Sequence, residues 1–120
     1  MIIELIEHDL IPVMKWEGDC TSRLETIGDI PAGKAIYWFE LTDLITAKEI
    51  IGDTVCLRGN VPASILNTAT PDDVDDYCKN IINKVGKGGG LILDGAIGVP
   101  DEARIENVVA MAQSVKKYAF

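Results

Sequence analysis

The chain has 120 residues, of which 48% are hydrophobic, so it is long enough for one domain with a substantial core. Its formal net charge of −8 argues against a nucleic acid or an anionic membrane as partner, because both require a basic surface. No apolar run approaches the roughly 18 residues of a membrane span, and the acidic N-terminal segment lacks the basic flank of a signal peptide, so we expect a cytoplasmic protein.

Strand and helix signals alternate along the whole chain. The predicted elements are, in order, the end of a helix over residues 1–9, a strand at Leu10–Trp16, a helix from Thr21 to about Ile30, a strand at Lys34–Phe39, a helix capped by Thr42 or Asp43 and ending at Ile51, a strand at Thr54–Arg58, a helix at Pro71–Val85, a strand at Gly90–Leu93, and a last helix from about Arg104 to Ala119. This order, with nearly continuous apolar strands, predicts a parallel sheet covered by helices.

The helix at Pro71–Val85 has the strongest start signal in the chain. Thr70 is predicted to cap it, Pro71 suits its first turn, and the carboxylates of Asp72 and Asp73 face the positive end of the helix dipole. Its apolar positions repeat every 3.6 residues: Val74, Cys78, Ile81, Ile82 and Val85. In the last helix, the expected buried positions are Ile105, Val108, Val109, Ala112 and Val115.

Four βα units are half of an eight-stranded barrel, which typically needs about 250 residues. An isolated sheet of this kind leaves two strand edges unpaired and one face without a cover. The sheet is therefore either flat and doubly wound or half of a (β/α)8 barrel whose other half comes from elsewhere.

Ligands bind at the carboxyl ends of the strands in either architecture. The polar residues at those ends are Lys15, Glu17, Asp19, Glu40, Arg58, Asn60 and Asp94. Converging carboxylates, cations and an amide predict a binding rim, although strand ends that emerge into water are also polar without any function.

The remaining reactive residue types give weaker signals. His8 has no metal-ligating partner at a useful spacing and is interpreted as a surface residue. Cys56 and Cys78 fall on buried positions, whereas Cys20 precedes a helix start, where a thiolate is favoured, but it has no neighbouring base. The Gly88-Gly89-Gly90 run precedes a strand, so it is interpreted as a turn and not as a phosphate loop.

The stretch from residue 59 to residue 118 resembles the C-terminal part of the uroporphyrinogen decarboxylase superfamily, methyltransferase-like branch. The motifs that carry the resemblance are Gly59-Asn60-Val61, Thr70-Pro71, Gly88-Gly89-Gly90, Gly98-Val99-Pro100 and Glu106-Asn107-Val108. Residues 10–58 fit the same superfamily more loosely. The resemblance implies that residues 1–120 are a single domain formed by the last four βα units of a (β/α)8 barrel.

The superfamily includes cofactor-free decarboxylases and methyltransferases that use a corrinoid protein. Its thiol-methylating members bind zinc through a His-x-Cys pair and a third cysteine, whereas this chain has Lys15, Glu17 and, near the last of these positions, Ile97. Only Glu17 could ligate zinc among them. The decarboxylases place a histidine near the position of Ile97, which is also missing here.

The leading hypothesis is a half-barrel that contributes to a corrinoid-dependent methyltransferase or demethylase site once a second half completes it. Glu17 and Glu40 are the candidates for proton handling or metal binding, and Arg58 for holding an anionic group, with Lys15, Asp19, Asn60 and Asp94 as further substrate-binding residues. The alternatives are a non-catalytic module that binds a tetrapyrrole, a corrinoid or a protein partner, and a uroporphyrinogen decarboxylase. The expected partner is a second copy in a homodimer or a complementary N-terminal half-barrel, with a corrinoid protein as a further candidate partner.

Overall fold

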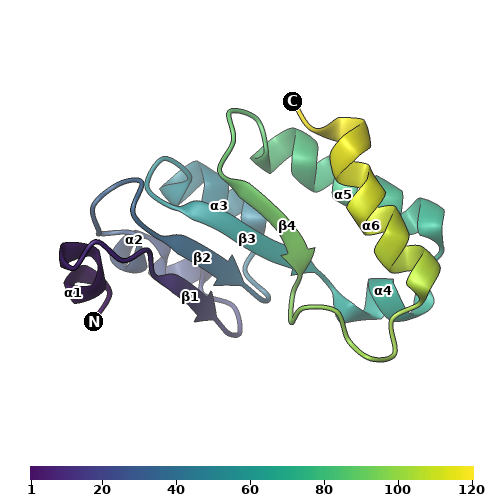
Figure 1. Cartoon of the computed structure of the whole chain (residues 1–120), viewed down its shortest axis with the longest axis horizontal. Helices are drawn as coiled ribbons and strands as arrows, with labels where there is room; N and C mark the ends of the chain where they lie inside the picture. Colours follow the sequence, from purple (N-terminus) through teal and green to yellow (C-terminus); the bar gives the residue numbers. More distant parts are fainter.

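Four strands form one parallel sheet in the order β1-β2-β3-β4 (Figure 1). The structure is a computed structural model that describes residues 1–120. Its elements are α1 (Ile2–Glu7), β1 (Val13–Trp16), the short 3-10 turn η1 (Thr21–Arg23), α2 (Leu24–Ile27), β2 (Ile36–Phe39), α3 (Leu44–Ile51), β3 (Cys56–Val61), α4 (Ala63–Thr68), α5 (Pro71–Val85), β4 (Leu91–Gly95) and α6 (Ile105–Tyr118).

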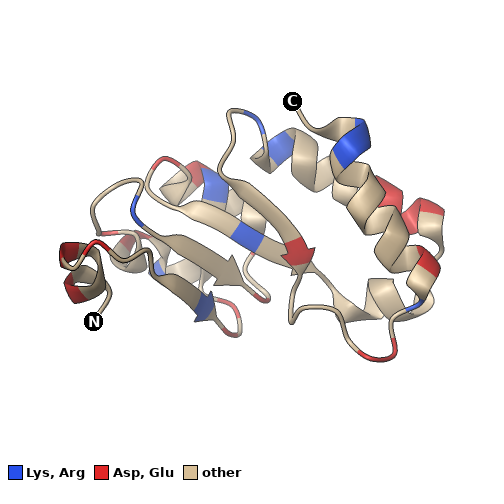
Figure 2. Ribbon diagram, in the orientation of Figure 1, with Lys and Arg blue, Asp and Glu red and all other residues tan.

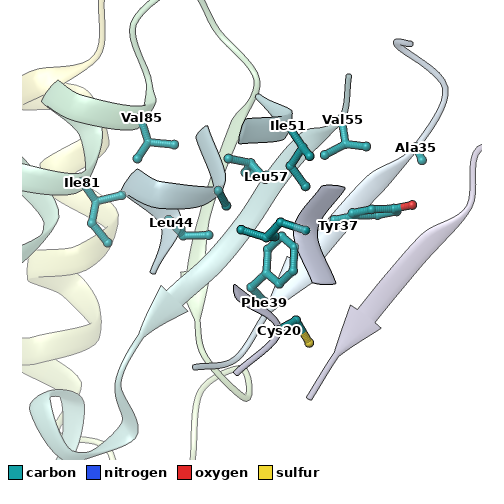
Figure 3. Close-up of a cluster of buried hydrophobic side chains, with 12 residues drawn as sticks. Cys20, Ala35, Tyr37, Phe39, Leu44, Ile51, Val55, Leu57, Ile81 and Val85 are labelled. Atoms are coloured by element: carbon teal, nitrogen blue, oxygen red, sulfur yellow. The ribbon is translucent and has the colours of Figure 1, made fainter. Parts of the chain in front are cut away.

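The main core lies between one face of the sheet and helices α2, α3 and α5. Alternation along the strands sends Tyr37, Phe39 and Leu57 into this layer, where all three are completely buried (Figure 3). Leu44 and Val85 meet them from the helices. The opposite face of the sheet has no helix over it, as Figure 1 shows. Helices on one face only are the arrangement of a barrel wall, whereas a doubly wound sheet has helices on both faces.

Two hydrogen bonds show that this uncovered face is concave. The Lys15 ammonium on β1 donates to the Ala96 carbonyl at 3.3 Å, and the Trp38 indole on β2 donates to the Gly95 carbonyl at 3.0 Å. In a flat sheet β1 and β4 would be separated by about 14 Å, because neighbouring strands lie about 4.8 Å apart. The sheet therefore curves as half of a (β/α)8 barrel does, and the prediction of four βα units in a half-barrel is confirmed.

Local sequence signals predicted the starts of α5 and α3 correctly. Thr70 and Asp73 form a capping box at the start of α5, and the buried residues of α5 are those that its period predicted. Asp43 caps α3 by accepting from the Thr46 amide at 3.2 Å, which decides between the two predicted caps.

Several boundaries differ from the predictions. β1 begins at Val13 because Ile11, which is 68% exposed, lies outside the sheet, and α2 ends already at Ile27. β3 continues past Arg58 to Val61, since β4 pairs with it along this whole length. The short helix α4 was not predicted, because its sequence has no side-chain cap and only one buried residue, Leu66.

The predicted buried face of α6 was wrong. Ile105, Val109 and Val115 are 79%, 45% and 42% exposed, whereas the buried residues are Asn107, Met111 and Ser114. The two polar residues tolerate burial because the Asn107 amide donates to carbonyls of α4 and its C-terminal end, and the Ser114 hydroxyl donates to the Met111 carbonyl. The apolar side of α6 is consequently left uncovered.

None of the helices is long and apolar enough to cross a membrane.

Candidate functional site

The uncovered face of the sheet carries a cluster of charged side chains around Trp38. Lys15, Trp38 and Arg58 are register partners on β1, β2 and β3, so they lie side by side across the strands. The Lys15 ammonium is 3.8 Å and the Arg58 guanidinium carbon 4.0 Å from the centroid of the Trp38 ring. Cations approach an aromatic ring over its negative face, so Trp38 holds two positive charges within about 8 Å of each other.

Asp94 on β4 completes this cluster, which we call the Trp38 cluster: Lys15, Trp38, Arg58 and Asp94. Its Oδ2 accepts from Arg58 Nε at 2.9 Å and from the terminal guanidinium nitrogen at 2.8 Å. The two side chains are 31% and 20% exposed, so water and ligands can still reach the pair. The other carboxylate oxygen of Asp94 accepts from the Gly95 amide at 2.7 Å, which fixes its orientation.

The Trp38 cluster has an excess of positive charge on a strongly acidic chain. It contains two cations and one carboxylate, whereas the whole chain carries −8. Figure 2 shows basic residues on β1 and β3 and an acidic residue at the end of β4, with the other acidic residues on helices and connecting segments. Lys15 is exposed and pairs with no carboxylate, so its positive charge is available to an anionic ligand.

The two candidate catalytic carboxylates differ in their surroundings. Glu40 is half-buried, and its Oε1 accepts from the Gly18 amide at 2.9 Å, so it connects the segments that follow β2 and β1. Glu17 is exposed, and its carboxylate makes no hydrogen bond or ion pair. Asp19 lies on the surface, where it accepts from the amide and hydroxyl of Thr21; these hydrogen bonds lower the pKa of Asp19.

Asn60 lies behind the face and supports it. It is 7% exposed, and its amide donates to the Thr42 carbonyl at 2.6 Å. The Thr42 hydroxyl accepts from the Cys20 amide at 2.8 Å. These contacts link the carboxyl ends of β1, β2 and β3, so Asn60 can position the rim but has little surface to offer a substrate.

A small pocket of about 190 Å3 opens at the carboxyl ends of β2, β3 and β4. Glu40 lines it together with Leu41, Pro62, Ala63, Ala96 and Ile97. The pocket adjoins the Trp38 cluster, because Lys15 donates to the carbonyl of the same Ala96. The rim therefore combines a half-buried carboxylate in a mainly apolar pocket with the Lys15 ammonium at the edge of that pocket.

The residues of this rim do not fit a zinc ion. No three His, Cys, Asp or Glu side chains come close enough together to hold a metal. Lys15 is directed to the Ala96 carbonyl and Trp38, and Ile97 has no donor atom. Glu17 would be a single ligand, whereas zinc sites use three or four.

The cysteines and the histidine lie apart from the rim chemistry. Cys20 is 4% exposed and its thiol donates to the Glu17 carbonyl at 3.6 Å, with no base beside it. Burial raises the pKa of the Cys56 and Cys78 thiols, which favours their unreactive form. His8 is exposed on the segment after α1.

Trp38 is the one member of the Trp38 cluster that the sequence analysis did not select. Alternation in β2 places Tyr37 and Phe39 in the core and therefore Ile36 and Trp38 on the opposite face. This alternation was the sequence signal that could have identified Trp38 as a site residue. It places a tryptophan on the helix-free face, in register with a lysine and an arginine. The structure thus brings Lys15, Arg58 and Asp94 together, and leaves Glu17 and Asp19 outside this contact network.

Comparisons with known proteins agree on one family. The profile of the uroporphyrinogen decarboxylase (URO-D) family matches residues 3–118. The uroporphyrinogen decarboxylase of Coxiella burnetii (strain RSA 493 / Nine Mile phase I) is 30% identical over 79 residues, which are 66% of this chain and 22% of that protein. The uroporphyrinogen decarboxylase of Pseudoalteromonas atlantica is 27% identical over 110 residues, which cover 91% of this chain and 30% of that protein.

A solved structure has the same fold. A methyltransferase from Methanosarcina mazei superposes with a TM-score of 0.75 at 21% sequence identity, over 92% of this chain and 32% of that chain. The chain thus spans less than a third of each of these three proteins.

Proposed function

Since the chain belongs to the uroporphyrinogen decarboxylase (URO-D) family, we propose that its Trp38 cluster binds an anionic group of a tetrapyrrole-class ligand. We further propose that the barrel, once a second half completes it, transfers a methyl group to or from a corrinoid. The positively charged cluster on the concave face carries this proposal. The name of the Methanosarcina mazei structure supports methyl transfer, and the names of the curated relatives support a tetrapyrrole ligand.

The residues have distinct roles in this proposal. Lys15 and Arg58 hold the anionic group, Trp38 sets the spacing between them, and Asp94 orients the guanidinium. Asn60 supports the rim from behind through the Thr42 carbonyl. The side chains that present charge to the ligand therefore all come from strands, which hold them more rigidly than loops would.

A carboxylate at the rim takes a proton in the proposed reaction. A thiol that accepts the methyl group would lose its proton, and the corrinoid would keep the electron pair of its broken bond to the methyl carbon. A nearby carboxylate can accept the proton of the thiol. Glu17 is free to do so, whereas Glu40 has one oxygen engaged by the Gly18 amide and lines the pocket. In the completed barrel, Glu17→Gln should abolish methyl transfer, and unchanged turnover would exclude this role.

Ligand binding can be tested on the chain itself. The purified protein is titrated with methylcobalamin, whose nucleotide loop carries a phosphodiester, and separately with uroporphyrin, which carries carboxylates. We expect the double substitution Lys15→Ala and Arg58→Ala to weaken binding at least tenfold, because it removes both cations of the Trp38 cluster. Lys34→Ala is the matched control, since Lys34 is an exposed lysine at the opposite, amino end of β2. Absence of binding to both tetrapyrroles, or an equal loss in the control, would refute the proposed site.

A non-catalytic binding module is the second candidate. It is favoured by the surroundings of the two carboxylates, since Glu40 accepts a hydrogen bond from a backbone amide and the Glu17 carboxylate makes no hydrogen bond or ion pair. Such a module would bind a tetrapyrrole through the Trp38 cluster, and the completed barrel would show no methyl transfer from methylcobalamin to a thiol. Binding of uroporphyrin with no binding of methylcobalamin would instead favour decarboxylase-like chemistry.

A further inference from the structure

Asp94 is the only acidic residue in the four strands. The strands contain just two other charged side chains, Lys15 and Arg58, and the contacts of the Trp38 cluster place all three on the concave face. A carboxylate repels any anion that approaches such a face. Asp94 therefore limits how much negative charge the Trp38 cluster can accept from a ligand.

Hydrogen bonds hold the negative charge of Asp94 in place. Its Oδ2 accepts from Arg58 Nε at 2.9 Å and lies 2.8 Å from the terminal nitrogen Nη2, while its Oδ1 accepts from the Gly95 amide at 2.7 Å. Both oxygens are thus engaged, and the carboxylate cannot turn away from an incoming anion without losing one of these contacts. It also occupies the edge of the guanidinium that a ligand carboxylate would use for a two-point contact.

The donors that remain suit one anionic group. The Lys15 ammonium has three N–H donors, and the chain supplies one acceptor for them, the Ala96 carbonyl. The second terminal nitrogen of Arg58 makes no hydrogen bond within the chain. Two cations and one carboxylate leave a single positive charge in excess. One singly charged group can therefore lie against both cations, whereas a second anionic group would meet Asp94.

We propose that Asp94 makes the Trp38 cluster selective for a ligand with one singly charged group, such as a phosphodiester, and against a ligand that presents several carboxylates together. A fixed like charge is an effective way to reject the wrong ligand, because it costs that ligand binding energy directly. The inference rests on the proposed function and adds to it which anionic group the cluster accepts. The contacts that support it all join residues of this chain.

The test compares two ligands on the purified chain by titration calorimetry. Methylcobalamin carries one phosphodiester, and uroporphyrin carries several carboxylates. We expect the wild type to bind methylcobalamin at least tenfold more tightly. We expect Asp94→Asn, which keeps an acceptor for the Gly95 amide, to strengthen uroporphyrin binding at least fivefold and to change methylcobalamin binding less than twofold. Glu49→Gln is the matched control, because it changes the net charge equally from an exposed position on α3, which covers the other face of the sheet.

The outcomes separate this inference from the proposed function. Tighter binding of uroporphyrin than of methylcobalamin to the wild type would overturn the selectivity but leave the cluster as a binding site. An equal effect of Asp94→Asn on both ligands, or an equal effect of Glu49→Gln, would do the same. Binding of neither ligand would overturn both proposals. If circular dichroism shows that Asp94→Asn is not folded, Asp94→Ser provides the same comparison, since its hydroxyl can also accept a hydrogen bond.

Discussion

Asn107 is the residue whose substitution tests the packing of α6 most sharply. It is completely buried, and its amide nitrogen donates to the Ala69 carbonyl at 2.8 Å and to the Leu66 carbonyl at 3.0 Å. The Leu66 carbonyl would keep the Arg104 amide as a donor after Asn107→Ala, whereas the Ala69 carbonyl would lose its donor. The asparagine Oδ1, which has no partner, would be removed without loss.

We expect Asn107→Ala to lower the free energy of unfolding by about 2–3 kcal/mol. Each lost hydrogen bond contributes roughly 1 kcal/mol, and a buried carbonyl left unpaired costs about as much again. The measurement is urea unfolding followed by circular dichroism, with Asn83→Ala as the control, because Asn83 is exposed on α5. A loss below 0.5 kcal/mol for Asn107→Ala would show that α6 and α4 are not joined through this amide.

Three further predictions concern stability. Gly59→Ala should destabilise the chain by roughly 2–4 kcal/mol, because a Cβ there would lie 2.7 Å from the Phe39 carbonyl oxygen at a φ of +127°; near-wild-type urea unfolding would refute this. Thr70→Ala should cost about 1 kcal/mol by removing the α5 cap, which thermal unfolding can detect. A hydrogen bond from Tyr118 lowers the pKa of Asp75, so the ionised carboxylate stabilises the folded chain at neutral pH, and this stabilisation is lost as the pH falls below about 3.8. The difference in unfolding free energy between the wild type and Asp75→Asn should therefore shrink over that pH range. A difference that stays constant would contradict this prediction.

The sequence predicted the order of the elements because each βα unit carries strong local signals. The cap at Thr70 and the 3.6-residue period of α5 were sufficient for its boundaries. The aromatic and branched residues of β2 were sufficient to predict the strand and its end at Phe39, although it begins at Ile36 and not at Lys34. The boundaries of β3 depend on pairing with β4, which no local signal reports. Helix α4 likewise owes its position to tertiary contacts, above all the hydrogen bonds from Asn107.

The buried face of α6 shows how hydrophobicity alone can mislead. Its most apolar stripe, including Ile105 and Val109, is exposed, whereas Asn107 is buried because its amide finds carbonyl partners. Hydrophobic periodicity predicts which side of a helix is more apolar. The buried side of α6 is decided instead by the carbonyls that the Asn107 amide reaches.

The candidate site was predictable in position but not in composition. Polar residues at strand ends predicted the rim, and the structure joins Lys15, Arg58 and Asp94 there. Whether a given side chain faces the concave side of the sheet depends on contacts that the sequence does not specify. The Asn60 amide points behind the face and donates to the Thr42 carbonyl. Trp38 was not selected because it lies in an aromatic strand whose residues are expected to be buried.

The most direct test of the proposed binding face uses the two tryptophans as paired reporters. Trp38 lies on the concave face between two cations, whereas the Trp16 indole nitrogen is buried. In a 15N-labelled sample titrated with diamagnetic methylcobalamin, we expect the Trp38 indole resonance to shift saturably while the Trp16 resonance stays in place. A shift confined to Trp16, or no shift of either resonance at millimolar ligand, would contradict a ligand site at the Trp38 cluster.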